Sequence, residues 1–374
     1  MQLEFKPDFE QARQRWDSLW KGVNKRPLVL AVVPKPGVKA AEGPRYMSWF
    51  DGPFEPVVDQ LLAWAETRDF LGEAIPSFCL HFGADTMAGY LGGDLQLAGD
   101  QGSSGSWTVP FIEDLDKTEI SFRKDGHWWK RTVEFGQALR ERCDGKLLIA
   151  GPPLAANLDV LAAMRGSQNL LMDLVVCPDA VKRALDAICR AHTEIIQALA
   201  ELLGWDTWGS MNNEGTYVSG RHSRPQCDFS CMISEEMFRE FAIPCLQSEG
   251  NDNDAFVYHL DGPGAIRHLP ALCELEALDL VCYVPGQPGQ LGREAEKSLY
   301  ATIDALGKGQ MLLFDANKEK ITFGWKAQEI VRAWRKFKTP KLVFQADVSS
   351  KTEAEDLLGE LETEAIHRKG QTCL

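Results

Sequence analysis

The sequence predicts an α/β fold, a (β/α)8 TIM barrel with loop insertions near residues 34–52 and 91–127. Short apolar runs alternate with segments of helical periodicity, and no two strand-like runs follow one another directly. This alternation implies a parallel sheet, and about eight repeats favour a closed barrel. An open doubly wound sheet is the alternative, but no Gly-x-Gly-x-x-Gly fingerprint follows the first strand.

The individual elements follow from local patterns. Residues 9–22 are amphipathic, and Gly/Pro clusters end most apolar runs. Pro178 followed by Asp179 is typical of a helix start, as is Ser234 at an N-cap. Residues 205–208 have poor strand propensity, yet they occupy the place of the fourth strand. The other expected strands are 28–33, 75–80, 147–150, 256–260, 278–284, 311–314 and 341–345, and the other main helices are 57–67, 129–142, 158–203 in at least two pieces, 291–306, 325–337 and 352–366.

Composition limits the function classes. A net charge of −14 and a pI near 5.1 argue against nonspecific binding to nucleic acid or anionic membrane. The sequence has no run of about 18 apolar residues and no signal-peptide core, so we expect a soluble, cytoplasmic protein. Its ten cysteines are then expected to be reduced core residues. We expect one domain over 1–374, with an N-terminal helical segment at 1–24, the barrel at 25–366 and a tail at 367–374.

The stretch from residue 256 to 266 carries the clearest chemical signal. An apolar run leads to His259 and Asp261, and Gly262-Pro-Gly then breaks the strand. Residues two apart on a strand point to the same side, so the imidazole and the carboxylate suit metal ligation or a proton-transfer pair. The alternative is that Asp261 caps the next helix and His259 is structural.

In the expected barrel, polar residues that are scattered along the sequence lie together in one site, because barrel sites lie at the carboxyl ends of the strands. Packing, capping or solvation remains the alternative for several members, notably Asn157, Asp159, Glu214, Tyr283 and Asp347. The polar residues at the expected strand ends are Lys35, His81, Asn157, Asp159, Asn212, Asn213, Glu214, His259, Asp261, Tyr283, Asp315, Asn317, Gln345 and Asp347.

Several motifs resemble the uroporphyrinogen decarboxylase superfamily over nearly the whole chain, most strongly over 151–290. The matching stretches are Arg26-Pro27, Asn157-Leu-Asp-Val-Leu-Ala-Ala-Met-Arg-Gly166, the segment 228–244 with its Ser-Glu-Glu-Met-Phe helix start, Tyr258-His-Leu-Asp-Gly-Pro-Gly and Val284-Pro-Gly. The resemblance implies a TIM-barrel enzyme. The Arg-Gln-Ala-Gly-Arg motif of the true decarboxylases is absent after the first strand, where residues 34–45 stand. This favours the cobalamin-linked methyltransferase-like branch.

That branch implies methyl transfer between a small methyl donor and a corrinoid partner protein, with a catalytic zinc. His259 matches the family's zinc histidine, and Asp261 stands where the family has a cysteine. The resemblance thus predicts zinc on His259, Asp261 and Asp347, and a catalytic group that also includes Tyr283 and Asp228. The expected substrate contacts are Lys35, His81, Asn157, Asn212, Asp315 and Gln345.

Two other functions stay open at this point. One is decarboxylation of uroporphyrinogen or a related acid without a cofactor, in which Lys35 or Arg45 neutralises carboxylates and Asp228 or Asp261 binds pyrrole N–H groups. The other is a barrel that only binds a ligand. A homodimer is left open in each case, and no nucleic-acid or membrane partner is expected.

Overall fold

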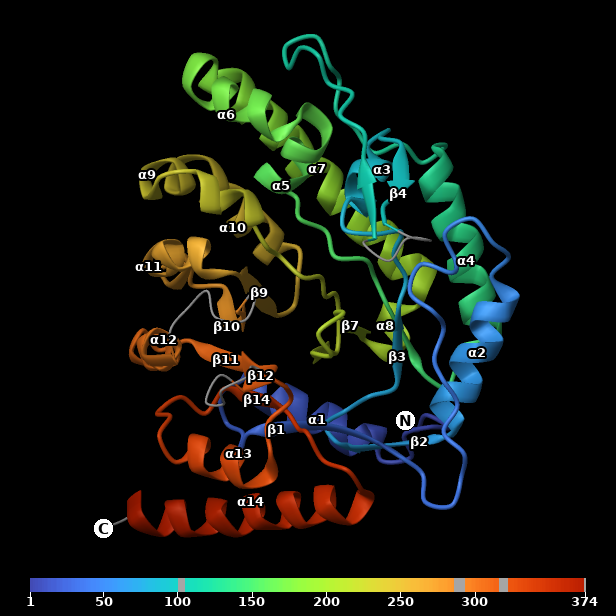
Figure 1. Cartoon of the computed structure of the whole chain (residues 1–374), viewed down its shortest axis with the longest axis vertical. Coiled ribbons are helices and arrows are strands. Elements are labelled where there is room, and N and C mark those ends of the chain that lie inside the picture. The colour runs from blue at the N-terminus through green and yellow to red at the C-terminus, as the bar shows by residue number, and fades with distance from the viewer. Residues whose placement is uncertain (100–104, 286–292, 316–321, 373–374) are drawn as a thin grey trace.

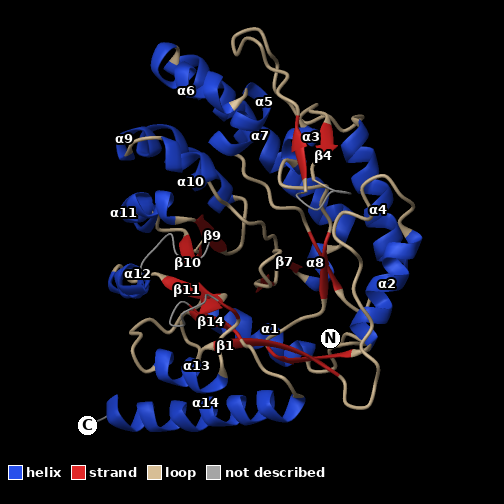
Figure 2. Cartoon of the chain, in the orientation of Figure 1, coloured by secondary structure: helices blue, strands red, loops and turns tan. Residues whose placement is uncertain are grey.

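The computed structural model describes residues 1–99, 105–285, 293–315 and 322–372. It has a mixed α/β fold whose central sheet is mostly parallel. Figures 1 and 2 show helices around the periphery and the main strands nearer the centre. No helix in the described part of the chain combines the length and apolarity needed to cross a membrane.

The largest sheet has six strands, in the order β2-β1-β14-β11-β10-β9. Neighbouring strands are parallel except for β1 and β2, which are antiparallel. Most of its side chains are buried, as expected for a sheet covered on both faces. The strands are β1 (Leu28–Pro34), β2 (Arg68–Gly72), β9 (Phe256–Asp261), β10 (Leu278–Val284), β11 (Gly309–Leu312) and β14 (Leu342–Gln345).

The remaining strands form four separate pairs. β3 (Ser77–Cys79) and β6 (Leu148–Ala150) are parallel. The other pairs are antiparallel: β4 (Leu95–Leu97) with β5 (Ser106–Thr108), β7 (Ser210–Met211) with β8 (Tyr217–Val218), and β12 (Phe314–Asp315) with β13 (Thr322–Phe323). The hairpin of β4 and β5 lies in the expected insertion at 91–127.

The expected closed barrel differs from the structure in one respect. Among the described residues, no strand ladder joins β3 and β6 to the six-stranded sheet, so hydrogen bonding does not run continuously around a barrel. The strands on this side have only two or three residues. Gly151, Pro152 and Pro153 follow β6 directly, and proline cannot donate to a ladder.

The fourth expected strand is also displaced. Residues Trp205–Trp208 form the short helix α8, and the strand β7 begins two residues later. Gly204 and Gly209 on either side have positive φ angles of 72° and 75°, so the backbone turns sharply at both ends. The buried Trp205 indole donates to the Ile149 carbonyl at 3.1 Å, which fixes the helix against β6.

The helices agree with the expected pattern in most places. The longest helix in the described part of the chain, α7 (Pro178–Leu203), has a continuous stripe of buried residues, and Gly204 ends it in the left-handed conformation. Ser234 acts as the expected N-cap, since its hydroxyl accepts from the Met237 N–H at 3.2 Å. The helices are α1 (Phe9–Trp20), α2 (Glu55–Glu66), α3 (Thr86–Tyr90), α4 (His127–Cys143), α5 (Leu158–Arg165), α6 (Ser167–Val176), α7 (Pro178–Leu203), α8, η2 (Asp228–Met232), α9 (Glu235–Met237), η3 (Phe238–Ala242), α10 (Ile243–Asn251), η4 (Pro263–His268), α11 (Leu269–Cys273), α12 (Arg293–Ala305), α13 (Ala327–Trp334) and α14 (Lys351–Thr372).

A buried ion pair holds the start of β1. Arg26, 6% exposed, donates through both terminal nitrogens to Glu73, which is fully buried, at 3.1 and 2.9 Å. Glu73 also accepts from the Val29 N–H at 2.7 Å. The Arg26-Pro27 motif therefore has a structural role at the amino end of the strand, away from the strand ends that carry the polar residues.

Candidate functional site

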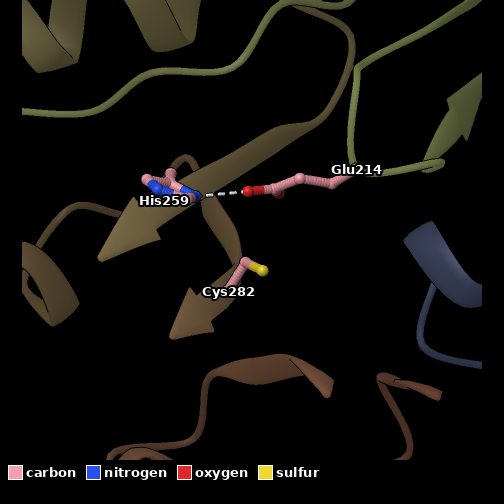
Figure 3. A group of neighbouring side chains, drawn as sticks. All are labelled: Glu214, His259 and Cys282. Atoms are coloured by element: carbon pink, nitrogen blue, oxygen red, sulfur yellow. Dashed lines mark hydrogen bonds and ion pairs between the residues drawn. The ribbon is translucent and has the colours of Figure 1, made fainter. Parts of the chain in front are cut away.

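Glu214, His259 and Cys282 approach one another closely (Figure 3). One ligand atom from each side chain lies within 4.8 Å of the others. They are the only group of His, Cys, Asp and Glu side chains in the described ranges that is close enough to hold one metal ion. We refer to these three residues as the central triad.

Strand register brings two members of the triad together. His259 on β9 pairs with Cys282 on β10, whereas Leu260 pairs with Tyr283. Because successive residues of a strand point to opposite faces, Cys282 shares the face of His259 and Tyr283 points the other way. The structure thus puts Cys282 in the place where the sequence interpretation had Tyr283.

A tight turn after β7 presents Glu214. The buried Asn212 carbonyl oxygen Oδ1 accepts from the backbone N–H groups of Glu214 and Thr216, both at 3.1 Å. Gly215 in the same turn has a φ of 92°, a conformation that favours glycine. The Oδ1 of Asn212, a residue expected to contact substrate, fixes the position of the Glu214 backbone, and its buried Nδ2 has no hydrogen-bond partner among the described residues.

Electrostatics in the triad favour an ionised Glu214. Its Oε1 lies 2.5 Å from His259 Nδ1. Burial alone would raise the pKa of the carboxyl, but the charges and hydrogen bonds of His259 and Arg224 lower the pKa overall. Burial followed by the Glu214 charge raises the pKa of the Cys282 thiol well above its usual value. Glu214 Oε2 is buried and has no hydrogen-bond partner among the described residues.

Arg224, in the loop before η2, is a site residue that the sequence interpretation missed. Its Nη1 lies 3.1 Å from His259 Nδ1 and 3.6 Å from Glu214 Oε1. Its Nη2 donates to Gln226 Oε1 at 2.5 Å. Arg224 lies far from any predicted strand end, so its position in the sequence did not indicate that it belongs to the site. Only the folded loop brings this cation to the triad.

A cavity of about 450 Å³ lies beyond Gln226. Gln226 Nε2 donates to Asp228 Oδ2 at 2.9 Å, and both residues line the cavity. Asp159 accepts from the N–H groups of Asp228 and Phe229 at 2.9 and 2.8 Å. Desolvation by the surrounding protein, followed by the Asp159 charge, raises the pKa of Asp228 to about 7. Asp228, expected to be catalytic, is therefore a cavity residue linked through Gln226 to Arg224.

His81 follows β3 and is close enough to Arg224 for its charge to act on the imidazole. Burial, followed by the Arg224 charge, lowers the pKa of His81 to about 4. Its Nδ1 accepts from the Gly83 N–H at 3.0 Å, as a neutral imidazole can. His81 is therefore a neutral ring beside the site.

Other expected contacts are engaged in holding the fold. Asn157 caps α5 and donates to Gln226 O and Glu249 Oε1, both at 2.7 Å. Gln345 donates to the Leu30 carbonyl at 3.1 Å.

Lys35 follows β1, and no hydrogen bond or ion pair in the described ranges joins its side chain to the triad. The side chain of Asp315 and all of Asn317 lie outside the described residues.

The structure brings only part of the expected zinc ligand set together. Asp347 pairs with Lys326 Nζ at 2.8 Å and is not part of the triad. Asp261 is exposed at the end of β9, and its charge contributes to the raised pKa of Asp228. His259 is the one member of the predicted set that joins the triad. Beside His259 the triad has a carboxylate from Glu214 and a sulfur from Cys282, whereas Asp261 and Asp347 lie outside it.

Comparison with solved structures finds a methyltransferase from Methanosarcina mazei, with a TM-score of 0.56 and 12% sequence identity. The match covers 92% of this chain and 96% of that protein. No family model and no curated protein matches the sequence. The chain therefore has the fold of this methyltransferase over nearly its whole length.

Proposed function

We propose that the protein is a methyltransferase-like enzyme that moves a one-carbon group between a small methyl donor and a corrinoid protein. The observation that carries the proposal is the convergence of Glu214, His259 and Cys282 on one point. Oxygen, nitrogen and sulfur donors from three residues are a ligand set suited to zinc. Catalytic zinc sites use three protein ligands and leave a fourth position for substrate.

The triad fits a zinc ion by its own chemistry. The buried Glu214 Oε2 lacks a partner among the described residues, and an unpaired buried carboxylate oxygen is costly. The pKa of Glu214 is lowered, so the carboxylate is ready to ligate. When bound there, zinc would act as a Lewis acid that lowers the pKa of a coordinated thiol or water.

The surrounding residues have positioning roles. Asn212 fixes the Glu214 turn, and His259, followed by Arg224, lowers the pKa of the Glu214 carboxyl. The β9–β10 register fixes the separation of His259 and Cys282. Because both strands are buried on both faces over most of their length, the rigid sheet limits movement of these two side chains.

The cavity favours methyl transfer over decarboxylation of a porphyrinogen. Substrates with several carboxylates need cations, yet no Lys or Arg is among the described residues that line the cavity. Three aspartates line it instead, namely Asp85, Asp159 and Asp228. A carboxylate-rich substrate would be repelled there.

A corrinoid assay tests the proposal. The zinc-loaded full chain is mixed with cob(I)alamin and a panel of small methyl donors, and methylation is followed from the corrinoid absorbance. We expect a donor-dependent rate that falls at least about 100-fold in His259→Ala, since loss of a metal ligand should exceed the loss of a residue that only orients one. Asp206→Asn alters an exposed residue on α8 and serves as the control. Rates equal to those without protein for every donor, or release of CO2 from uroporphyrinogen, would contradict the proposal.

A further inference from the structure

The cavity beside the triad has an unusual charge balance. Asp85, Asp159 and Asp228 line it, and no Lys, Arg or His is among its described lining residues. Burial is the largest cause of a raised pKa in all three carboxyls, because little positive charge offsets their desolvation. A ligand that carries positive charge would compensate this cavity, and an anion would not.

A metal ion does not match this arrangement. The three aspartates do not form a group whose oxygens lie within 4.8 Å of one another, the separation found in the triad. Carboxylates spread around a volume of about 450 Å³ instead suit an organic cation, and this volume lies within the range of small-molecule pockets.

The walls between the carboxylates are apolar. Met87, Trp107, Pro110, Val160 and Phe229 line the cavity. Trp107 is 52% exposed, although large aromatic side chains are usually buried. Indole faces attract ammonium groups, and N-methyl groups gain from apolar contact.

A second observation points independently to a ligand. Thr108 also lines the cavity and is only 8% exposed. Its hydroxyl oxygen receives no donor among the described residues, whereas its hydroxyl and its backbone N–H both face the Asp85 carboxylate, the N–H donating to Asp85 Oδ2 at 2.7 Å. Buried hydroxyl groups are normally paired. A ligand with a polar group near its cationic end would satisfy this oxygen.

The cavity is coupled to the triad through side chains. Asp228 accepts from Gln226, which accepts from Arg224, which contacts both His259 and Glu214. Gln226 also forms a parallel β-bridge with His259. The wall of the cavity is thus continuous with the backbone that carries the proposed zinc ligand.

We infer that this cavity binds a small methylated ammonium compound, held by Asp85, Asp159 and Asp228 with Thr108 as a polar contact. As an assignment of the methyl donor's chemical class, this inference rests on the proposed function. As a binding site it does not depend on zinc.

Calorimetry on the zinc-free full chain tests the inference with a matched pair of probes. Choline carries an ammonium group, and 3,3-dimethylbutan-1-ol has the same shape without the charge. We expect choline to bind at least about tenfold more tightly, because the carboxylates and the Trp107 indole attract its positive charge, which the neutral probe lacks. Equal affinity for the two probes, or no choline binding, would overturn the inference.

Two variants localise the binding. Asp85→Asn keeps an acceptor for the Thr108 N–H and removes one charge, so choline affinity should fall at least about tenfold. Asp206→Asn removes an exposed carboxylate on α8 and should bind choline like the wild type. An unchanged affinity in Asp85→Asn would place choline elsewhere and refute the site. Because no zinc is present, failure here leaves the corrinoid assay as a separate test of the proposed function.

Discussion

Glu214 Oε1 lies 2.5 Å from His259 Nδ1, although the two residues are 45 positions apart and lie on different elements. The contact joins the turn after β7 to the middle of β9. It depends on Asn212, whose side chain accepts two backbone N–H groups of that turn.

Asn212→Ala should therefore disturb both stability and metal binding. Two backbone N–H groups, of which that of Thr216 is buried, lose their acceptor, which costs about 1–3 kcal/mol in the free energy of unfolding. Zinc affinity should fall about 10–100-fold, as for other residues that orient a ligand. Denaturant unfolding and competition with a chromophoric chelator measure the two effects. Asn213→Ala, an exposed neighbour, should change neither quantity; similar losses in both variants would count against the positioning role.

The Arg26–Glu73 pair predicts a large effect on stability alone. Arg26→Ala leaves the buried Glu73 without its main cation, which should cost about 3–5 kcal/mol in the free energy of unfolding. Urea unfolding measures the loss. Arg239→Ala breaks the surface pair with Glu274 and should cost far less. The structural assignment fails if the two variants are equally stable.

Asp228 should make stability fall as the pH rises. Its folded pKa of about 7 exceeds its usual 3.8, so between these values the folded state holds a proton that the unfolded state releases. Asp159, Asp261, His259 and Arg224 are the charged or titratable groups acting on it. Asp228→Asn should remove this downward slope between about pH 4 and pH 7 in unfolding experiments. An identical pH profile in both proteins would show that the Asp228 pKa is not raised.

His81 should act in the opposite direction. Its pKa is about 4 in the folded protein and 6.5 ordinarily, so the unfolded state binds the extra proton between these values. The contribution of His81 is present above about pH 6.5 and is lost as the pH falls towards 4. His81→Asn keeps an acceptor for the Gly83 N–H. It should reduce the loss of folding stability as the pH falls from about 6.5 towards 4. Proton NMR of the imidazole gives a second readout, and a titration midpoint near 6.5 would refute the assignment.

Much of the fold follows from the sequence because hydrophobic periodicity and Gly/Pro punctuation are local signals. They place β1, β9, β10 and β14 within a few residues of their observed bounds. The displaced strand β7 follows a helix at Trp205–Trp208 that depends on two left-handed glycines and on a tertiary hydrogen bond. The antiparallel strand β2 likewise depends on pairing with β1 and was not expected.

The candidate site was predictable only in part. The rule that polar residues at strand ends converge brought His259 and Glu214 into the same set. Cys282 lies inside an apolar run and reads as a core residue until the register places it opposite His259. Arg224 lies in an irregular loop, where sequence patterns give no orientation. Asp347 reads like a ligand in sequence, but Lys326 pairs with it.

Cobalt substitution tests whether the triad binds a metal, because Co(II) replaces zinc and reports thiolate ligation through an intense near-ultraviolet charge-transfer band. We expect one Co(II) per chain with this band in the wild type and loss of the band in Cys282→Ser. The band should remain in Cys231→Ser, because Cys231 is exposed and lies outside the triad. A wild-type protein without the band, or an unchanged band in Cys282→Ser, would contradict a metal site on Glu214, His259 and Cys282.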